Sequence, residues 1–327
     1  MTFTIILFFL IVGGMRVIQK VCSKKVSNLI DGSTYFHYGG YYQLLSAVFS
    51  LIALFFTGFY GFNGPTFWYA VGAAACTAIV LFTEIEALKG SSLIVGQMFD
   101  AGSIVIPCLF GHFVGSQPMS VWQWLGLLLF MIAMYLMLSQ GKETTDGESA
   151  NDAQKQKISP KTLLMLLIMW LAAGCLMIIQ NEVAALPDSN DGMFCLIMFS
   201  VNALVLYICY LVQAMLAGKN KIKNNAMTAE KQEKQEKFLK PLSKTFLICG
   251  AFLALALFAI NLLAVKLSAM LSSLGQQPLL FPLSAAIAII VTMLVGRLMY
   301  KEKMLPRNVI GMVLSAISVI IIAVCTV

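Results

Sequence analysis

Ten apolar segments, each close to the length needed to cross a lipid bilayer, dominate this sequence. They comprise residues 2–20, 33–57, 66–87, 91–114, 121–139, 161–183, 192–217, 245–266, 271–298 and 308–326. A hydrocarbon core about 30 Å thick requires roughly 20 apolar residues at 1.5 Å of rise per residue. Hydrophobic residues make up 59% of the 327 residues and charged residues only 11%, against about 25% in soluble domains. The sequence therefore predicts an all-α integral membrane protein with ten transmembrane helices.

Two polar linkers interrupt the apolar segments. Residues 140–160 lack apolar periodicity and are expected to be flexible. Residues 218–244 contain eight lysines and are expected to form a cytosolic loop. The first linker follows five segments, which divides the chain into a first five-helix unit, residues 1–139, and a second, residues 161–327.

Sequence similarities between these two units indicate an internal duplication. Gly13 and Gln19 of the first segment align with Gly174 and Gln180 of the sixth. The third and eighth segments end in Ala-Leu-Lys and Ala-Val-Lys, and each is followed directly by the next segment. A duplicated unit with an odd number of spans inserts its two copies in opposite orientations. We therefore expect two inverted five-helix repeats.

The basic residues are distributed as this inversion requires. We assign Lys20, Lys24 and Lys25 to the loop at the end of the first segment, whereas the corresponding loop after the sixth segment has no lysine or arginine. In contrast, the loops after the seventh and ninth segments are basic and those after the second and fourth are not. Because basic loops remain in the cytosol, we expect a multi-pass plasma membrane protein with both termini outside the cytosol.

Three short motifs resemble the drug/metabolite transporter superfamily, specifically its EamA-like ten-helix permeases. They are the Gly-rich end of the first segment before Gln19-Lys20, residues 87–92 between the third and fourth segments, and residues 299–311 between the ninth and tenth. The turn at residues 115–120 departs from the pattern because it has no acidic residue. The resemblance implies a secondary transporter that works by alternating access and favours export.

Asp100 is the main candidate for a functional residue because it falls near the middle of the fourth segment. A carboxylate there costs about 2.5 kcal/mol or more. Asp100 lies eleven residues after Lys89, as Gln277 does after Lys266, so the two are repeat mates. We expect Asp100, Gln97, Gln276 and Gln277 to face a polar cavity, where Asp100 binds a cationic substrate or a coupling proton. The alternative is an Asp100 buried in a helix contact and bonded to a serine or a backbone carbonyl.

Further candidates for substrate binding come from other segments. The expected cavity lies between the first, third, fourth, sixth, eighth and ninth segments. Polar residues at matching positions, and aromatic residues at helical spacing, add to its lining: Gln19, Gln180, Tyr38, Tyr41, Tyr42 and Asn261. The tyrosines also fit an interfacial aromatic belt, and Asn261 a contact between helices. Arg16 and Glu182 fit snorkelling toward the membrane surface equally well, although an inward Arg16 can pair with Asp100 or with an anionic substrate.

The remaining charged and small residues favour structural roles. We expect Glu84 and Glu86 to pair locally with Lys89 near the cytosolic surface. Gly311 and Ser315 form a small-residue face on the tenth segment, which suits packing against the fifth segment or against a second protomer in a homodimer.

Several function classes lack their sequence signatures. The chain has no P-loop, dinucleotide fingerprint, HExxH motif or Cys/His metal pattern, so we expect no enzyme activity, cofactor or metal. Its basic residues lie beside the spans, which does not indicate nucleic-acid binding. The expected partners are the bilayer and a small solute, namely an organic metabolite, an amino-acid-like compound or an amphipathic cation. The alternatives are a nucleotide-sugar or sugar carrier of the same fold, and a receptor or scaffold that uses the lysine-rich loop.

Overall fold

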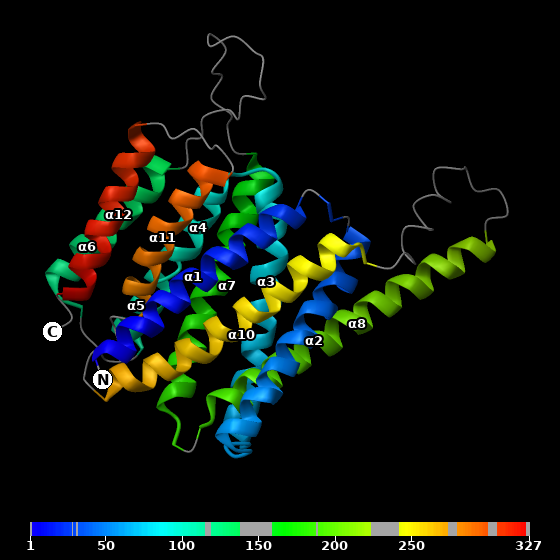
Figure 1. Ribbon diagram of the computed structural model, residues 1–327. Coiled ribbons are helices and arrows are strands. Elements are labelled where there is room, and N and C mark those ends of the chain that lie inside the picture. Colours follow the sequence, from blue (N-terminus) through cyan, green and yellow to red (C-terminus); the bar gives the residue numbers. More distant parts are fainter. Residues whose placement is uncertain are drawn as a thin grey trace, which may run out of the picture.

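The computed structural model describes residues 2–27, 29–30, 32–114, 119–137, 159–187, 189–223, 242–273, 280–299 and 306–324. Within these ranges the ordered elements are helices, and no strand is present. In chain order they are α1 (Thr2–Ser27), α2 (Gly32–Thr57), α3 (Gly64–Lys89), α4 (Leu93–Gly102), α5 (Val105–Phe113), α6 (Val121–Met137), α7 (Pro160–Ala185), α8 (Asp191–Lys223), α10 (Lys244–Ser272), α11 (Leu280–Met299) and α12 (Pro306–Val324) (Figure 1).

Seven helical segments in the described ranges are long and apolar enough to cross a membrane: Phe3–Ser27, Thr34–Thr57, Gly64–Lys89, Leu93–Phe113, Pro160–Ala185, Asp191–Leu216 and Lys244–Ser272. Shorter apolar helices occupy Val121–Ala133, Leu283–Met299 and Val309–Ser318. Each predicted apolar segment overlaps one of these ten stretches. The expectation of an all-α membrane protein is confirmed at this level. Residues 140–158 of the predicted linker (140–160) and residues 224–241 of the predicted lysine-rich loop (218–244) lie outside the described residues. Residues 218–223, which were predicted to belong to that loop, form the end of α8.

Local sequence explains where several helices begin and turn. The side chains of Asn63, Ser92 and Ser159 each accept a hydrogen bond from a backbone N–H in the first turn of α3, α4 and α7, which satisfies one of the donors that a helix start leaves free. Gly58 and Gly61 adopt φ values of +93° and +79° between α2 and α3. This left-handed backbone favours glycine, so the chain turns there between α2 and α3.

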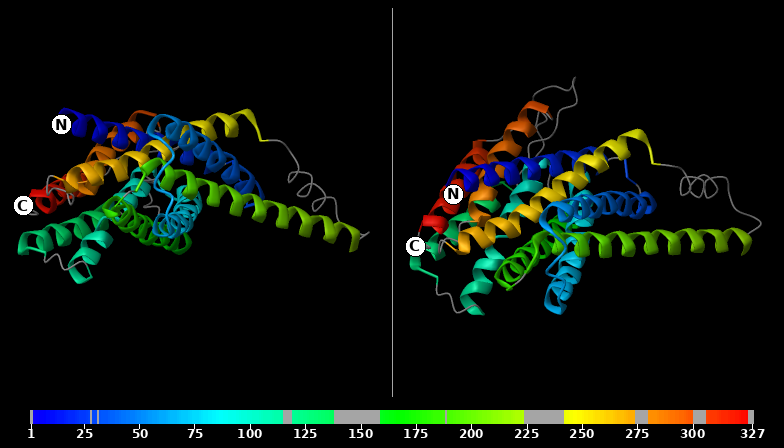
Figure 2. Two further views of the ribbon diagram at one scale, coloured as in Figure 1. Left: turned by 90° about the horizontal axis from the view of Figure 1, so that it is seen from below. Right: turned by 60° about the horizontal axis from the view of Figure 1, so that its bottom comes forward.

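The main helix contacts pair one helix before residue 138 with one after residue 159. α1 packs along α10 and α3 along α7, while α2 contacts α8, α4 contacts α11, and α6 contacts α12. The pair α6 and α12 lies at one end of the molecule and the pair α2 and α8 at the other (Figure 1). The C-terminal part of α8 extends beyond the remaining helices in both views of Figure 2. The two predicted five-helix units are therefore in contact along most of their length.

The end of α1 lies at the link between α3 and α4. α1 continues past the predicted end at residue 20 to Ser27. The ammonium group of Lys24 donates to the carbonyl oxygens of Leu88 at 3.0 Å and Ser91 at 2.8 Å. At the opposite end of α3, the Asn190 amide donates to the Gly58 carbonyl at 3.1 Å. Side-chain hydrogen bonds from α1 and from the loop before α8 thus fix the chain on either side of α3.

Candidate functional site

The predicted fourth span is divided into two short helices next to Asp100. α4 ends at Gly102 and α5 begins at Val105. Pro107 has no N–H, and its ring conflicts with the carbonyl group four residues earlier, that of Ser103. The Ser103 carbonyl accepts instead from Ile106 N at 3.1 Å. Ser103 N and Oγ both donate to the Asp100 carbonyl, at 3.2 and 2.5 Å. A two-residue turn therefore interrupts the span expected over 91–114, and Asp100 lies in the last turn of α4.

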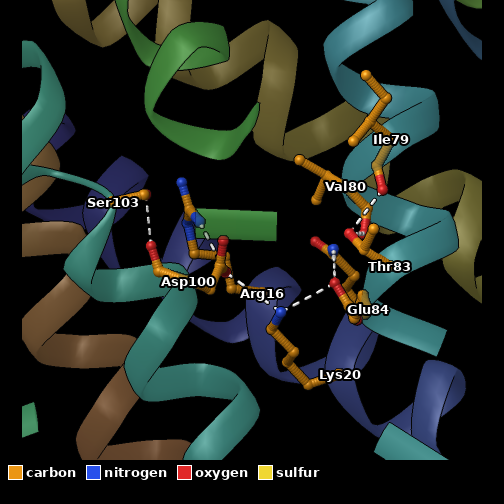
Figure 3. A network of polar contacts seen from close by, with 9 residues as sticks. Arg16, Lys20, Ile79, Val80, Thr83, Glu84, Asp100 and Ser103 are labelled. Carbon is orange, nitrogen blue, oxygen red and sulfur yellow. Dashed lines mark hydrogen bonds and ion pairs between the residues drawn. The ribbon is translucent and has the colours of Figure 1, made fainter. Parts of the chain in front are cut away.

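The Asp100 carboxylate lies between two cations of α1 (Figure 3). Its Oδ2 atom is 3.3 Å from Arg16 Nη1 and 3.4 Å from Lys20 Nζ. Arg16 and Lys20 are four residues apart and therefore lie on one face of α1. The Asp100 side chain is 6% exposed, and that of Arg16 is 12% exposed. Arg16 thus points into the protein, and Asp100 bonds to cations instead of to the serine or carbonyl that the alternative interpretation required.

Lys20 extends the cluster to a second carboxylate. Its Nζ atom is 2.9 Å from Glu84 Oε2, and both side chains are fully buried. Gln19 Nε2 donates to the same Glu84 oxygen at 3.0 Å. Two expectations are corrected here. Lys20 is not a loop residue, and Glu84 does not pair with Lys89, which bonds to Glu86.

The four charged side chains sum to zero. We call Arg16, Lys20, Glu84 and Asp100 the ion cluster; it joins α1, α3 and α4. An uncompensated charge in a protein interior costs several kcal/mol, whereas a paired and hydrogen-bonded one is tolerated. Asp100 therefore shares its buried surroundings with three further charged side chains.

A small cavity borders the ion cluster between the two halves of the chain. Its volume is about 40 Å³. Its polar lining consists of Arg16, Gln19, Thr77, Asp100, Gln180 and Asn261, and its apolar lining of Val80, Leu81, Ala173, Leu176, Met177, Leu257 and Ile260. These residues belong to α1, α3, α4, α7 and α10. The volume admits a few water molecules and is far below the roughly 300–1,000 Å³ of a typical small-molecule site.

The wall opposite the cluster is polar but uncharged. Gln180 Nε2 donates to Asn261 Oδ1 at 2.8 Å, and Asn261 Nδ2 donates to the Leu257 carbonyl at 2.8 Å. Gln180 and Asn261 thereby connect α7 to α10. Four of the predicted site residues therefore border one cavity, namely Gln19, Asp100, Gln180 and Asn261.

The other predicted site residues do not border this cavity. Tyr38 and Tyr42 are fully buried in an apolar cluster, where the Tyr38 ring contacts Phe246 at 5.4 Å between ring centroids. The Tyr41 hydroxyl donates to the Leu247 carbonyl at 3.3 Å. Gln97 is 1% exposed, and its amide makes no hydrogen bond within the described part of the chain.

Two of the predicted site residues, Gln276 and Gln277, lie outside the residues that the structure describes. Glu182 is exposed on α7. No group of three or more His, Cys, Asp or Glu side chains suited to a metal occurs among the residues that the structure describes.

Sequence reasoning missed Lys20 and Glu84 as members of the site. The available signal was the spacing of Arg16 and Lys20, one helical turn apart, together with an acid five residues before the end of α3. Both residues lie close enough to predicted span ends to be assigned to the membrane surface. The contacts themselves join residues 64 and 84 positions apart, which no local pattern specifies.

Comparison with known proteins gives a likeness of fold. No protein-family model matches the chain, and no curated protein matches it. Among solved structures, a chain described only as "Crystal structure of protein" is similar with a TM-score of 0.57 and 11% sequence identity, over 97% of this chain and 96% of the other. At this identity the similarity extends to the fold over nearly the whole length and to nothing further.

Proposed function

We propose that this protein is a secondary active transporter of a small organic metabolite and works by alternating access. The observation that carries the proposal is the buried ion cluster beside a polar cavity between the two halves of the chain. Intramembrane charges are costly, and they mark substrate or ion pathways by default. A purely structural bundle gains little from four such side chains, since well-packed apolar residues stabilise a core equally well.

The pairing of helices supports two inverted five-helix repeats. The contacts are reciprocal when the chain is divided into two units. One unit comprises α1, α2, α3, α4–α5 and α6, and the other comprises α7, α8, α10, α11 and α12. The first helix of each unit packs on the third of the other, while the second, fourth and fifth each contact their own counterpart. This is the pattern expected of units related by a two-fold axis, and sites in such transporters lie at the repeat interface.

The broken α4–α5 segment supports movement around the cavity. Transporter sites are commonly formed by discontinuous helices, and a proline break is a position where a helix bends. Because the cavity of about 40 Å³ is too small for an organic solute, α4, α5 and the helices around them have to separate during transport. We propose that the two halves rock about the cavity, with Asp100 next to the bend.

The geometry favours a metabolite over a simple amphipathic cation. Asp100 already faces both Arg16 and Lys20, so a cationic solute has to displace a cation that the protein supplies. Proton coupling through Asp100 remains part of the proposal, since Asp100 is a carboxylate that borders the cavity.

Flux measurements test the function directly. Purified protein in liposomes is assayed with a panel of small metabolites, with and without an imposed pH gradient. Saturable flux that depends on the protein supports the proposal, and an effect of the gradient supports proton coupling. Absence of protein-dependent flux across the panel contradicts it.

A receptor or scaffold is the alternative that the lysine-rich loop suggests. Deletion of residues 224–241 separates the two functions. A transporter retains most of its flux without the loop, because the cavity residues lie in the helices. A scaffold loses its activity with the loop.

A further inference from the structure

We infer that Arg16 binds a carboxylate group of the transported solute, while Lys20 remains beside Asp100 as a cation shared with Glu84. The inference rests on the proposed function for the role of the cavity, and it names the chemical class of the solute. It reverses the sequence-based expectation that Asp100 attracts a cation. The basis is that Lys20 bonds to two carboxylates, whereas Arg16 bonds to Asp100 alone among the described residues.

Arg16 has unused hydrogen-bonding capacity at the cavity. A guanidinium carries five N–H donors in a planar fork that matches the geometry of a carboxylate. Within the described part of the chain, Arg16 makes one hydrogen bond, from Nη1 to Asp100. Its Nε atom is buried without a hydrogen-bond partner among the described residues. Since Arg16 also borders the cavity, its donors are available to an anionic group there.

Asp100 keeps a cation when Arg16 turns toward a solute. The contacts from Arg16 and Lys20 reach the same oxygen, Oδ2, at 3.3 and 3.4 Å. Lys20 is also fixed by Glu84 at 2.9 Å, so it stays beside Asp100 whichever partner Arg16 has. Without another anion in the cavity, Arg16 remains bonded to Asp100. A solute carboxylate in the cavity competes with Asp100 for the guanidinium group of Arg16.

The cavity lining favours a carboxylate over a doubly charged phosphate. Arg16 is the one cation among the described lining residues, and the opposite wall consists of the uncharged amides of Gln180 and Asn261. The ion cluster is neutral, so a bound carboxylate leaves it with one net negative charge. A phosphate monoester carries close to two negative charges at neutral pH and therefore leaves close to two, which costs more in a buried site.

Ligand-induced stabilisation of the purified protein tests this assignment. The probes are short-chain carboxylates, each paired with its own primary amide: propionate and propionamide, lactate and lactamide, leucine and leucinamide. The midpoint of thermal unfolding is followed by tryptophan fluorescence. We expect at least one carboxylate to raise the midpoint while its amide does not. The inference is overturned if no carboxylate has an effect or if each amide acts as well as its acid.

Variants of Arg16 identify the binding group. Arg16→Gln is expected to weaken the apparent affinity for the effective carboxylate at least tenfold, and Arg16→Lys severalfold, because lysine lacks the planar fork. Arg297→Gln, an exposed arginine on α11, is the matched control and is expected to leave the affinity unchanged. Arg16→Lys preserves the charge of the cluster and covers the case in which Arg16→Gln does not fold. Unchanged affinity in the folded Arg16 variants overturns the inference.

Asp100→Asn gives opposite results for the two signs of substrate. If Arg16 binds the solute, removal of its competitor increases the apparent affinity for the carboxylate about tenfold. If Asp100 binds a cationic solute, the same variant loses ligand-induced stabilisation, which overturns the inference.

Flux in liposomes separates this inference from the proposed function. Flux of an amine or a neutral solute that is insensitive to Arg16→Gln upholds transport and overturns the inference. Arg16-dependent carboxylate binding without flux upholds the inference for the site and contradicts transport.

Discussion

The ammonium nitrogen of Lys20 lies 2.9 Å from Glu84 Oε2, and neither side chain is exposed to solvent. The pair joins α1 to α3, and Lys20 also reaches Asp100 on α4 at 3.4 Å. A buried ion pair contributes little net stability, yet removal of one partner leaves the other charge uncompensated. Lys20 thus links Asp100, which borders the cavity, to Glu84 on α3. A change in any one of these charges leaves another buried charge without its partner and favours a different packing of α1, α3 and α4.

Lys20→Met is expected to destabilise the protein by about 3–5 kcal/mol, because among the described residues Glu84 then retains only the Gln19 amide as a partner. The measurement is the thermal unfolding midpoint in detergent. Lys89→Met is the control: its ion pair with Glu86 is partly exposed, and such pairs contribute about 1 kcal/mol or less. Equal losses in the two variants would argue against a compensated internal charge.

Glu84→Gln combined with Lys20→Met is expected to be less destabilising than the sum of the two single variants, because removal of both charges leaves neither unpaired. A double-mutant cycle on the unfolding free energies measures the coupling, which we expect to be about 1.5 kcal/mol or more. Additive effects would contradict a direct interaction between the two side chains.

Asp100→Asn is expected to remove the dependence of solute flux on an imposed pH gradient, because an amide cannot take up the coupling proton, even where the variant binds the carboxylate more tightly. Flux is measured in liposomes over a range of pH values. Wild-type flux at every pH would remove Asp100 from the mechanism.

Pro107→Ala is expected to lower the transport rate without lowering thermal stability. Alanine restores an N–H that can bond to the Ser103 carbonyl, which favours a continuous helix across the break between α4 and α5. Pro160→Ala at the start of α7 is the control, because proline in the first helical turn removes no internal hydrogen bond. Unchanged flux in Pro107→Ala would show that the bend is dispensable.

Gly13→Ala and Gly14→Ala are expected to differ although the residues are adjacent on α1. A Cβ atom at Gly13 overlaps the Cγ2 methyl of Ile287 on α11 and lies 3.1 Å from its Cβ, whereas a Cβ at Gly14 meets nothing within 4 Å. Overpacking costs about 1–3 kcal/mol, and alanine at an open helix position gains roughly 0.5–1 kcal/mol over glycine. Unfolding midpoints compare the two; similar values would mean that α1 and α11 are not in close contact.

The fold was accessible from the sequence to the extent that it depends on local patterns. Apolar length marked where the helices lie, and Asn63, Ser92 and Ser159 each begin a helix through a hydrogen bond within their own turn. The two-residue turn between α4 and α5 follows from Pro107, which has no N–H, and from the alternative backbone bond between Ile106 and Ser103. Polar residues at matching positions in the two halves, Gln19 and Gln180, identified two sides of the cavity.

The sequence by itself determined that this chain forms apolar helices of membrane-spanning length and that Asp100 is an internal charge requiring a partner, because hydropathy and helical spacing are properties of neighbouring residues. Only the tertiary structure decided which partners Asp100 has. Whether Lys20 and Glu84 reach water or each other depends on how α1, α3 and α4 pack, over separations of 64 and 84 residues. The free energy of a buried charge is set by the groups that surround it in space, and chain order does not specify them.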